Sequence, residues 1–273
     1  MQSIREKVGS YTAKGGFENE HDIVAKFNNW QNDQVVQNWL SVLGYDFKKI
    51  RSLKAVQIPS RISKEKMMAF GVTVDKVTET KKYQKADAQI QVKIKVDDVF
   101  YIENISLKKA NKGAGFNQID KRKVETYQSM WGFSDEVASL LKLFTGEIEP
   151  SSEQQKTIKD VRRVNFQEMP ENDVNLVMQF FKNNKHKIIN DVFQGRGVLK
   201  ADWMLVTRKN KDGTLDWLLK DIIEVCNFYS MGEIIISPKG SLKIGGITMQ
   251  RKGGTPDPTS LQFKCNPLAL FEA

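Results

Sequence analysis

The sequence predicts an α+β protein in which a mixed central β-sheet is flanked by helices. Apolar residues recur at helical spacing over residues 17–43 and again over residues 119–143. Apolar and polar residues alternate over residues 88–96, which is typical of a half-buried strand. The elements follow one another as helix, strands, helices and strands, and this order favours an α+β arrangement over regular βαβ winding.

The first half of the chain begins with the helix over residues 17–43, and Gly44 is a suitable stop for it. Runs of Val, Ile, Met and Phe then predict strands at residues 50–58 and 67–79. In the second half, the polar segment 146–160 is the best candidate for an internal boundary. Beyond it we expect helices over residues 171–184 and 216–229, and short strands at residues 233–237, 242–249 and 260–264.

Composition limits the function. The formal net charge is +9 and the sequence pI is about 9.3, which indicates either a polyanionic partner or a merely basic soluble protein. No apolar run has the length of a membrane span, and the N-terminal residues lack the apolar region of a secretion signal. The sequence has no phosphate-binding GxxxxGK[ST] loop, so we expect no nucleotide cofactor.

Metal-binding and nuclease chemistries that depend on His or Cys are poorly supported. The two cysteines, Cys226 and Cys265, lie among apolar residues, and they are too few for a disulfide framework or a four-cysteine zinc site. The two histidines, His21 and His186, are far apart in the sequence. If the protein cleaves nucleic acid, carboxylates, a lysine and a metal ion have to perform the reaction.

One predicted hairpin carries residues suited to that reaction. A two-residue turn after residue 96 would pair positions that sum to 195, so Asp87 would oppose Lys108 and Gln89 would oppose Ser106. Opposed residues project to the same face of a sheet. An Asp, two polar residues and a Lys at one hairpin end suit metal-assisted phosphodiester hydrolysis. The alternative is an ordinary solvated hairpin face.

The spacing from Asp87 to Ser106-Leu107-Lys108 resembles a variant of the PD-(D/E)xK nuclease motif. Further segments resemble the small type II restriction endonucleases of the MspI type, most of all a member that cuts GCGC. The resemblance extends from about residue 9 to the C-terminus and is interrupted near residues 60–85, which we interpret as an inserted hairpin or loop. The segments are GGFENEHDIVAKFNNW (15–30), GFNQIDK (115–121), FTGE (144–147), GRG (195–197), SPKGS (237–241), QRKGG (250–254) and LQFK (261–264).

The resemblance implies a restriction-endonuclease-like core and hydrolysis of double-stranded DNA at a short palindromic site, by analogy GCGC. It implies Mg²⁺ as the cofactor, with Mn²⁺ as a substitute, and a monomer in a prokaryotic cytoplasm, although a dimer on DNA stays open. We expect one endonuclease domain over residues 1–273, with a catalytic core over about 1–147 and a target-recognition sub-region over about 186–273.

The same resemblance assigns roles to the hairpin residues. Asp87 would be the main metal ligand, with the carbonyl of Leu107, and Lys108 would orient the attacking water. Ser106 stands where the superfamily has an acid, and it is a weaker ligand because its oxygen is neutral. Gln89 or Glu20 could compensate, although Glu20 could equally be a helix N-terminal charge that complements the dipole.

Polar and basic residues in three places are candidates for contacts with DNA. Asn and Gln can hydrogen-bond base edges, Lys and Arg can bind guanine or phosphate, and we expect Gln250 and Lys252 to specify the sequence. The alternatives are a solvated basic loop near residue 112 and a simple basic turn near residue 251. The candidates are Lys109, Lys112, Asn117, Gln118, Lys121, Arg196, Ser237, Lys239, Ser241, Gln250, Arg251 and Lys252.

Two other functions compete with restriction. One is a DNA repair or structure-specific nuclease of the same superfamily. The other is a sequence-specific DNA-binding protein whose active site has decayed at Ser106.

Overall fold

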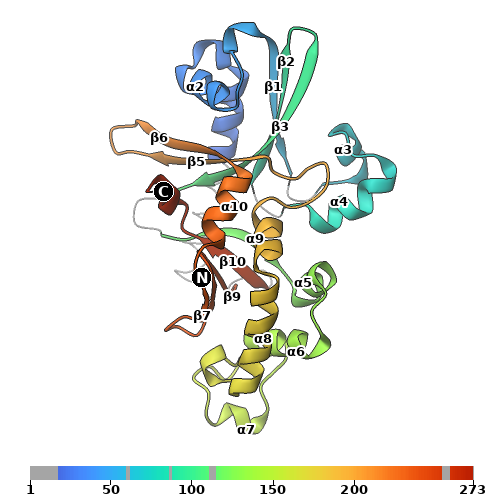
Figure 1. Ribbon diagram of the computed structural model, residues 1–273, viewed down its shortest axis with the longest axis vertical. Coiled ribbons are helices and arrows are strands. Elements are labelled where there is room, and N and C mark those ends of the chain that lie inside the picture. Colours follow the sequence, from blue (N-terminus) through green and yellow to red (C-terminus); the bar gives the residue numbers. More distant parts are fainter. Residues whose placement is uncertain (1–17, 60–61, 86–87, 111–114, 254–258, 273) are drawn as a thin grey trace, which may run out of the picture. The chain divides into compact units, whose positions relative to one another are not determined.

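The computed structural model describes residues 18–59, 62–85, 88–110, 115–253 and 259–272 (Figure 1). The chain divides into two compact units, and each unit is assembled from separate stretches of sequence. The borders between the units differ from the polar segment 146–160, which lies inside the second unit. Unit 1 consists of Met1–Gly115, Gln194–Val225 and Pro267–Ala273, and unit 2 consists of Phe116–Phe193 and Cys226–Asn266.

A five-stranded mixed sheet forms the centre of unit 1, in the order β1-β2-β3-β5-β6. Neighbouring strands are antiparallel except β3 and β5, which are parallel. This mixed sheet, with helices packed on it, confirms the α+β class. The strands are β1 (Ile50–Ile58), β2 (Gln89–Val96), β3 (Val99–Lys109), β5 (Trp203–Lys209) and β6 (Leu215–Asp221).

The predicted hairpin is formed by β2 and β3. Its turn lies at Asp97 and Asp98, and Asp97 has a left-handed φ of 50°, which Asp adopts more readily than most residues. Val96 pairs with Val99, as the two-residue turn requires. The predicted two-residue turn between the two strands is therefore confirmed.

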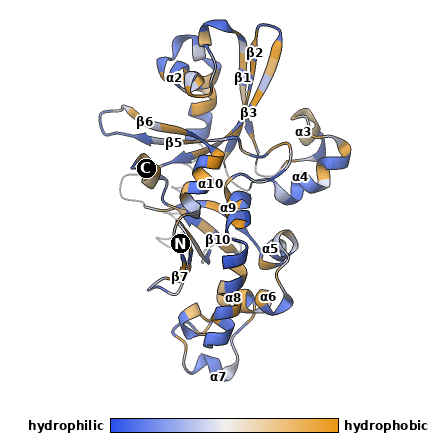
Figure 2. Cartoon of the chain, viewed as in Figure 1, coloured by the Kyte–Doolittle hydropathy of each residue, from blue (hydrophilic) through white to orange (hydrophobic). Residues whose placement is uncertain are grey.

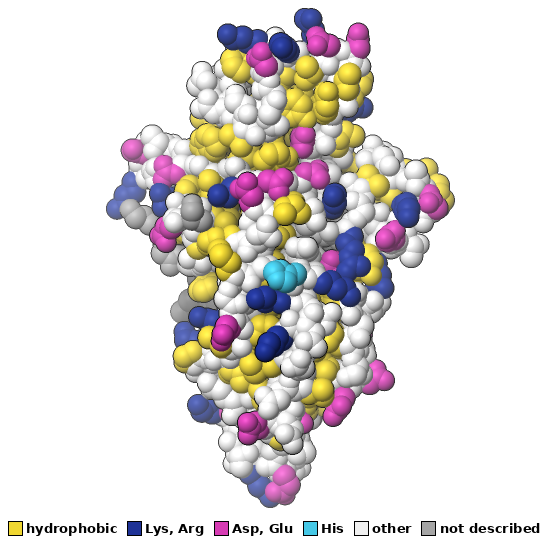
Figure 3. Space-filling view, in the orientation of Figure 1, with side chains coloured by type: hydrophobic (Ala, Val, Ile, Leu, Met, Phe, Trp, Pro, Cys, Tyr) yellow, Lys and Arg dark blue, Asp and Glu magenta, His cyan; other side chains and the backbone are white. Residues whose placement is uncertain are grey.

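The register of this hairpin is confirmed over the described residues, because Gln89 pairs with Ser106. The predicted opposition of Asp87 and Lys108 lies outside the described residues, since Asp87 is not among them. Near the turn, residues 99–102 of β3 extend beyond the part that pairs with β5 and are exposed and mostly apolar. Figures 2 and 3 show this hydrophobic region toward the turn of the β2–β3 hairpin.

Helices cover the apolar face of the unit 1 sheet. The expected continuous helix over 17–43 is wrong: residues 18–28 are helical, a 3₁₀ turn (η1, Trp30–Asn32) follows, and α2 runs over Gln34–Val42. The break has a local cause, because the Asp33 side chain accepts hydrogen bonds from the first backbone amides of α2 and so begins a new helix. The stop at Gly44 is confirmed by its left-handed φ of 89°.

The segment between β1 and β2 is helical, so the strand expected over residues 67–79 and the hairpin or loop expected over 60–85 are both wrong over the described residues. Its elements are α3 (Lys64–Ala69), η3 (Val74–Lys76) and α4 (Val77–Tyr83). Met67 and Val72 pack with Leu199 in a small separate core. A short apolar run is compatible with a strand or a helix. Here the helical form allows the apolar residues to pack in the core that contains Leu199.

A second five-stranded sheet, antiparallel throughout, forms the centre of unit 2 in the order β4-β10-β9-β8-β7. The strand expected over residues 242–249 is divided, because Gly245 turns the chain with a left-handed φ of 57°. A side chain at Gly245 would meet the Tyr229 carbonyl at 2.5 Å, so only glycine fits this turn. The strands are β4 (Asn117–Arg122), β7 (Ile234–Ile236), β8 (Leu242–Ile244), β9 (Ile247–Arg251) and β10 (Leu261–Cys265).

The helices of unit 2 differ from expectation mainly at their ends. The helix expected over 119–143 begins instead as β4 and then divides at Gly132, whose φ is 75°. The helix expected over 216–229 begins only after β6, and neither β5 nor α9 was predicted from the sequence. The remaining elements of unit 2 are α5 (Val124–Trp131), α6 (Asp135–Thr145), α7 (Ser152–Gln155), η4 (Phe166–Glu168), α8 (Glu171–Asn183) and α9 (Lys185–Phe193). Helix α10 (Ile222–Ser230) contains the border between the units, and η2 (Phe47–Lys49) and η5 (Pro267–Phe271) belong to unit 1. Within the described residues, no helix has the length and hydrophobicity to cross a membrane.

Candidate functional site

Three candidate active-site residues lie at one end of the β2–β3 hairpin. Gln89 pairs with Ser106, and Lys108 follows two residues later on β3, so all three share one face of the sheet. Their exposed fractions are only 1% for Gln89, 0% for Ser106 and 3% for Lys108. An ordinary hairpin face would be solvated, so this burial rules out the solvated alternative for these three residues.

The loop before β5 covers this polar face. The Gln89 side chain donates a hydrogen bond from Nε2 to the Leu199 carbonyl at 2.9 Å, and Asn104 donates from Nδ2 to the Val198 carbonyl at 3.1 Å. Gln91 in turn donates to Asn104 Oδ1 at 3.1 Å. Amide side chains therefore fix the loop over the end of the hairpin.

The oxygen of the Gln89 side-chain amide lacks a hydrogen-bond partner within the described part of the chain. This atom, Oε1, is buried. A buried carbonyl oxygen without a partner is costly, so such atoms usually have a function or bind a water or ion. Since Gln89 is paired with Ser106, this oxygen belongs to the candidate active site.

Lys85 is a residue of this site that the sequence analysis missed. Its side chain is among the fully buried ones, with an exposed fraction of 2%, and its Nζ donates a hydrogen bond to Ser106 Oγ at 2.5 Å. The sequence gives little signal, because Lys85 closes the basic run KKYQK, which is typical of a solvated helix end. An ammonium on Ser106 Oγ makes that oxygen an unfavourable place for a second cation.

Glu20 projects inward from the helix over residues 18–28. Its side chain is 7% exposed and accepts a hydrogen bond from Gln57 on β1. Burial raises the pKa of Glu20, against the opposing effects of the Gln57 hydrogen bond and the charges of His21 and Lys108. The burial of this carboxylate and its hydrogen bond with Gln57 favour a site role for Glu20 over a solvated helix-end charge.

Arg196 lies in unit 1 and packs on the connection that precedes β2. Its guanidinium stacks on the Tyr83 ring, 4.2 Å from the ring centre, and its backbone amide donates to the Tyr83 carbonyl at 3.4 Å. Gly195 lies so close that a Cβ there would meet the Tyr83 carbonyl at 2.9 Å. The Gly195-Arg196 segment thus supports the chain just before Lys85.

Unit 2 brings two recognition candidates together through a third glutamine. Gln262 on β10 donates to Gln118 Oε1 on β4 at 2.6 Å, and Gln250 on β9 donates to Gln262 Oε1 at 3.3 Å. The chain of amides connects three adjacent strands on the polar face of the sheet. Gln262 was not among the residues predicted from the sequence, although the alternation of Gln262 and Lys264 with buried apolar residues in β10 is a period-two signal.

Arg251 does not share the face of Gln250. Successive residues of a strand point to opposite faces, and Arg251 lies 3.8 Å from Asp160, while Gln250 contacts Gln262. Lys252 follows the end of β9, and its backbone amide donates to the Ser260 carbonyl at 2.9 Å. Gln250 and Arg251 therefore cannot read bases from the same side.

The β7–β8 turn contains the other recognition candidates of unit 2. Ser237 Oγ accepts a hydrogen bond from the Ser241 amide at 3.1 Å, and the Ser237 amide donates to the Ser241 carbonyl at 2.7 Å. The Ser237 hydroxyl thus holds the turn together, and Lys239 is exposed at its tip. The remaining candidates are half-buried at strand positions, except Lys112, which lies outside the described residues: Lys109 on β3, and Asn117 and Lys121 on β4.

The family model of the R.HinP1I restriction endonuclease matches residues 68–271, which is well over half of the chain. The chain belongs to the R.HinP1I restriction endonuclease family. This membership places the protein among the type II restriction endonucleases, and hence among the nucleases. The match includes the β2–β3 hairpin and all of unit 2, whereas Glu20 and Gln57 precede it.

Comparison of structures finds a similar fold in the crystal structure of the restriction endonuclease MspI in complex with its cognate DNA. The TM-score is 0.57 at 14% sequence identity, and the match covers 96% of this chain and 94% of that chain. At this identity the likeness concerns the fold alone. A search of curated protein sequences finds no match.

Proposed function

We propose that this restriction endonuclease hydrolyses double-stranded DNA at a short palindromic site, by analogy GCGC, with Mg²⁺ or Mn²⁺ as cofactor. The observation that carries the proposal is the burial of Lys108, Ser106 and Gln89 on one face of β2–β3 in a chain of this family. We further propose that the enzyme acts as a monomer in a prokaryotic cytoplasm and needs no nucleotide cofactor.

The donor atoms of the site suit a hard divalent cation. The described residues contain no group of three or more His, Cys, Asp or Glu side chains that could hold a metal. Hard cations also accept amide and backbone carbonyl oxygens and retain several waters. Gln89 Oε1, the Leu107 carbonyl and Asp87 would hold the ion. Ser106 fits less well as a ligand than the sequence suggests, because the Lys85 ammonium occupies its oxygen.

When bound, the metal ion would polarise the phosphate and lower the pKa of a coordinated water. Lys108 orients the attacking water and offsets the negative charge that develops on the phosphate. The charge of Lys108 is one of the causes that lower the pKa of Glu20 against the effect of burial, and Glu20 would help to position Lys108. Ser106 positions the ammonium of Lys85, the second lysine of the site.

Recognition of the target is proposed for unit 2. Gln250, Gln118 and Lys252 would contact base edges, since amides can bind adenine and Lys can bind guanine. Supporting contacts, mostly to phosphates, are proposed for Lys109, Lys112, Asn117, Lys121, Arg196, Ser237, Lys239 and Ser241.

Digestion of a sequenced plasmid, with mapping of the cut ends, tests the function. We expect discrete fragments with Mg²⁺ or Mn²⁺ and ends that map to one short palindrome. Random nicking or a preference for forked DNA would instead identify a repair or structure-specific nuclease. Binding of one sequence without cleavage by either metal would identify a decayed DNA-binding protein.

Two substitutions test the roles of the active-site residues. Asp87→Ala and Lys108→Ala should each abolish cleavage and leave DNA binding without metal largely unchanged, because neither residue is needed to hold the duplex. The matched control is Lys93→Ala, an exposed lysine on the same hairpin. Single-turnover cleavage and filter binding are the measurements, and cleavage at the wild-type rate by either variant would contradict its assigned role.

A further inference from the structure

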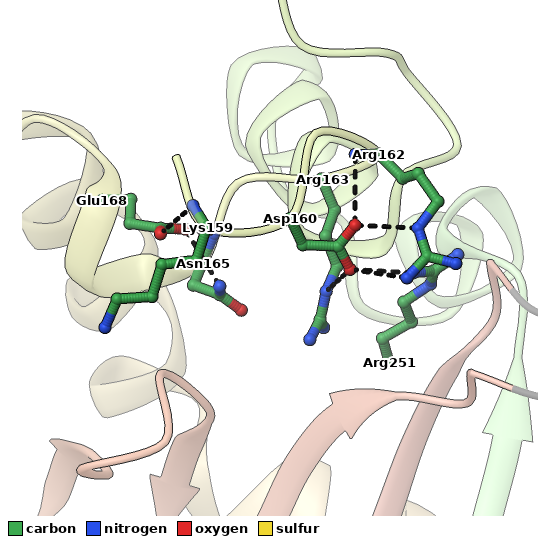
Figure 4. A network of polar contacts seen from close by, with 7 residues as sticks. All are labelled: Lys159, Asp160, Arg162, Arg163, Asn165, Glu168 and Arg251. Carbon is green, nitrogen blue, oxygen red and sulfur yellow. Dashed lines mark hydrogen bonds and ion pairs between the residues drawn. The ribbon is translucent and has the colours of Figure 1, made fainter. Parts of the chain in front are cut away.

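Three arginines surround one carboxylate in unit 2 (Figure 4). Arg162 donates to both oxygens of Asp160, from Nε at 2.8 Å and from Nη2 at 3.0 Å. Arg163 Nε donates to the same carboxylate at 3.3 Å, and Arg251 Nη1 lies 3.8 Å from it. We call Asp160, Arg162, Arg163 and Arg251 the arginine cluster.

The charges of the arginine cluster do not balance. The Arg162 hydrogen bond is the main cause that lowers the pKa of Asp160 to about 2, so this carboxylate is ionised at neutral pH. One negative charge then faces the guanidinium groups of Arg162 and Arg163, and Arg251 lies beside them. Burial, and next the charges of Arg163 and Arg162, lower the pKa of Arg251, which indicates repulsion within the cluster. Such an excess of positive charge favours an anionic ligand.

The loop that carries Arg162 and Arg163 is held in place before any ligand binds. Phe166 is buried and stacks on Phe144 with ring centres 4.3 Å apart, and the Val164 amide donates to the Leu143 carbonyl. At the loop end, the Glu168 carboxylate accepts hydrogen bonds from the Lys159 amide at 2.8 Å and the Asn165 amide at 2.9 Å. A rigid loop loses little conformational entropy on binding.

The same loop contacts the segments proposed to read bases. Gln167 donates a hydrogen bond from Nε2 to the Ser237 carbonyl at 3.0 Å, in the β7–β8 turn. A Cβ on Gly240 of that turn would lie 2.9 Å from the Asn165 side chain, so the two segments pack closely. On the other side of the cluster, Arg251 directly follows Gln250 on β9. The cluster therefore flanks both recognition segments.

We propose that the arginine cluster binds a phosphate of the DNA backbone beside the bases that are read, an inference that rests on the proposed function. Guanidinium groups bind phosphate through paired hydrogen bonds, and a rim of such contacts fixes the register of a protein on DNA. Asp160 holds the guanidinium groups in position, and the phosphate then shares them. Arg251 would contribute to binding through this phosphate and not through the bases, since its side chain points away from the face of Gln250.

The test is the salt dependence of DNA binding by the double variant R162A/R163A. Each phosphate contact contributes about 0.9 to the slope of log affinity against log salt concentration. The double variant should lower the magnitude of the slope by about one unit and weaken binding to cognate and non-cognate DNA alike, by at least about tenfold at low salt. The Arg162 side chain is 71% exposed, and thermal denaturation checks that the variant folds.

The matched control is Lys156→Ala, which removes one positive charge from a neutral pair with Glu153 a few residues away. An unchanged slope in the control supports a specific phosphate site. Wild-type affinity and slope in R162A/R163A would overturn the proposal, even if the wild-type enzyme cleaves its site. Absence of any cleavage or DNA binding by the wild type would instead refute the proposed function.

A second measurement distinguishes DNA phosphate from a free anion. The measurement is the increase in Tm that inorganic phosphate produces at fixed ionic strength, and the alternative outcome is a larger increase for the wild type than for R162A/R163A. If this occurs while both proteins bind DNA equally, the cluster is a site for small anions, and the DNA-contact proposal is wrong.

Discussion

At the scale of single residues, the pair Lys85 and Ser106 is the main departure from the motif that the chain resembles. The superfamily has an acid where this chain has Ser106, and an acid would contribute negative charge to a metal site. Here a buried ammonium donates to the serine hydroxyl instead. The local charge is thus more positive than in the motif, which would suit the proposed binding of the scissile phosphate and would leave fewer oxygens for a metal ion.

Replacement of Lys85 by Met tests this interpretation. Met has a similar length and no charge, so the fold should tolerate it, while the loss of one positioned cation should lower the single-turnover cleavage rate by roughly 100-fold. DNA affinity without metal should change by much less. The control is Lys81→Met, an exposed lysine of α4. A Lys85→Met enzyme with wild-type cleavage would show that Lys85 is only structural.

Glu20 provides a prediction about pH. Because burial raises its pKa above the ordinary value of 4.5, the native protein binds the proton more tightly than the unfolded chain does. Stability therefore falls as pH rises through the window between 4.5 and the raised native pKa. Glu20→Gln keeps an acceptor for Gln57 and removes the ionisation, so it should weaken this pH dependence and raise Tm above the window.

Thermal denaturation from about pH 4 to about pH 8 measures the effect of Glu20→Gln. Cleavage should fall at the same time, because the variant removes the carboxylate that we propose helps to position Lys108. A variant less stable than wild type at neutral pH would contradict the prediction. It would show that the ionised carboxylate is stabilised more by its charged neighbours than it is destabilised by burial.

At the scale of elements, the β2–β3 hairpin and the segment that supports it determine the geometry of the site. The hairpin register could be predicted, because the two-residue turn and the period-two alternation are local properties. The support by Gly195 and Arg196 could not be predicted, since it joins parts of the chain that are far apart in sequence.

Gly195→Ala tests this support. Gly195 has a left-handed φ of 74°, and a new Cβ would meet the Tyr83 carbonyl at 2.9 Å, so the connection before Lys85 has to shift. We expect a loss of about 2 kcal/mol of stability and a marked loss of cleavage. Gly213→Ala is the control, with a left-handed φ of 87° and no atom within 4 Å of its Cβ. Equal effects on cleavage in the two variants would mean that backbone strain alone matters, and not the contact with Tyr83.

At the scale of the whole molecule, the two units interleave along the chain. The catalytic candidates and the Gly195-Arg196 support belong to unit 1, whereas the glutamine chain, the β7–β8 turn and the arginine cluster belong to unit 2. A catalytic core over about 1–147 and a recognition sub-region over about 186–273 stay predictions as functional divisions. Part of the net charge of +9 lies in the buried lysines of the candidate site and part in the arginine cluster, so the location of the charges matters more than their total.

The sequence by itself determined the α+β class, the hairpin register, the stop at Gly44 and the resemblance to restriction endonucleases, because these depend on local periodicity, turn chemistry and residue order. Only the tertiary structure decided that residues 64–83 are mainly helical and that Lys85 donates a hydrogen bond to Ser106. It also decided that the Arg251 side chain points toward Asp160, on the sheet face opposite to Gln250. The physical reason is that burial and pairing between distant segments set these features. A lysine in a basic run or an arginine in a basic turn has the same local sequence whether it is solvated or enclosed.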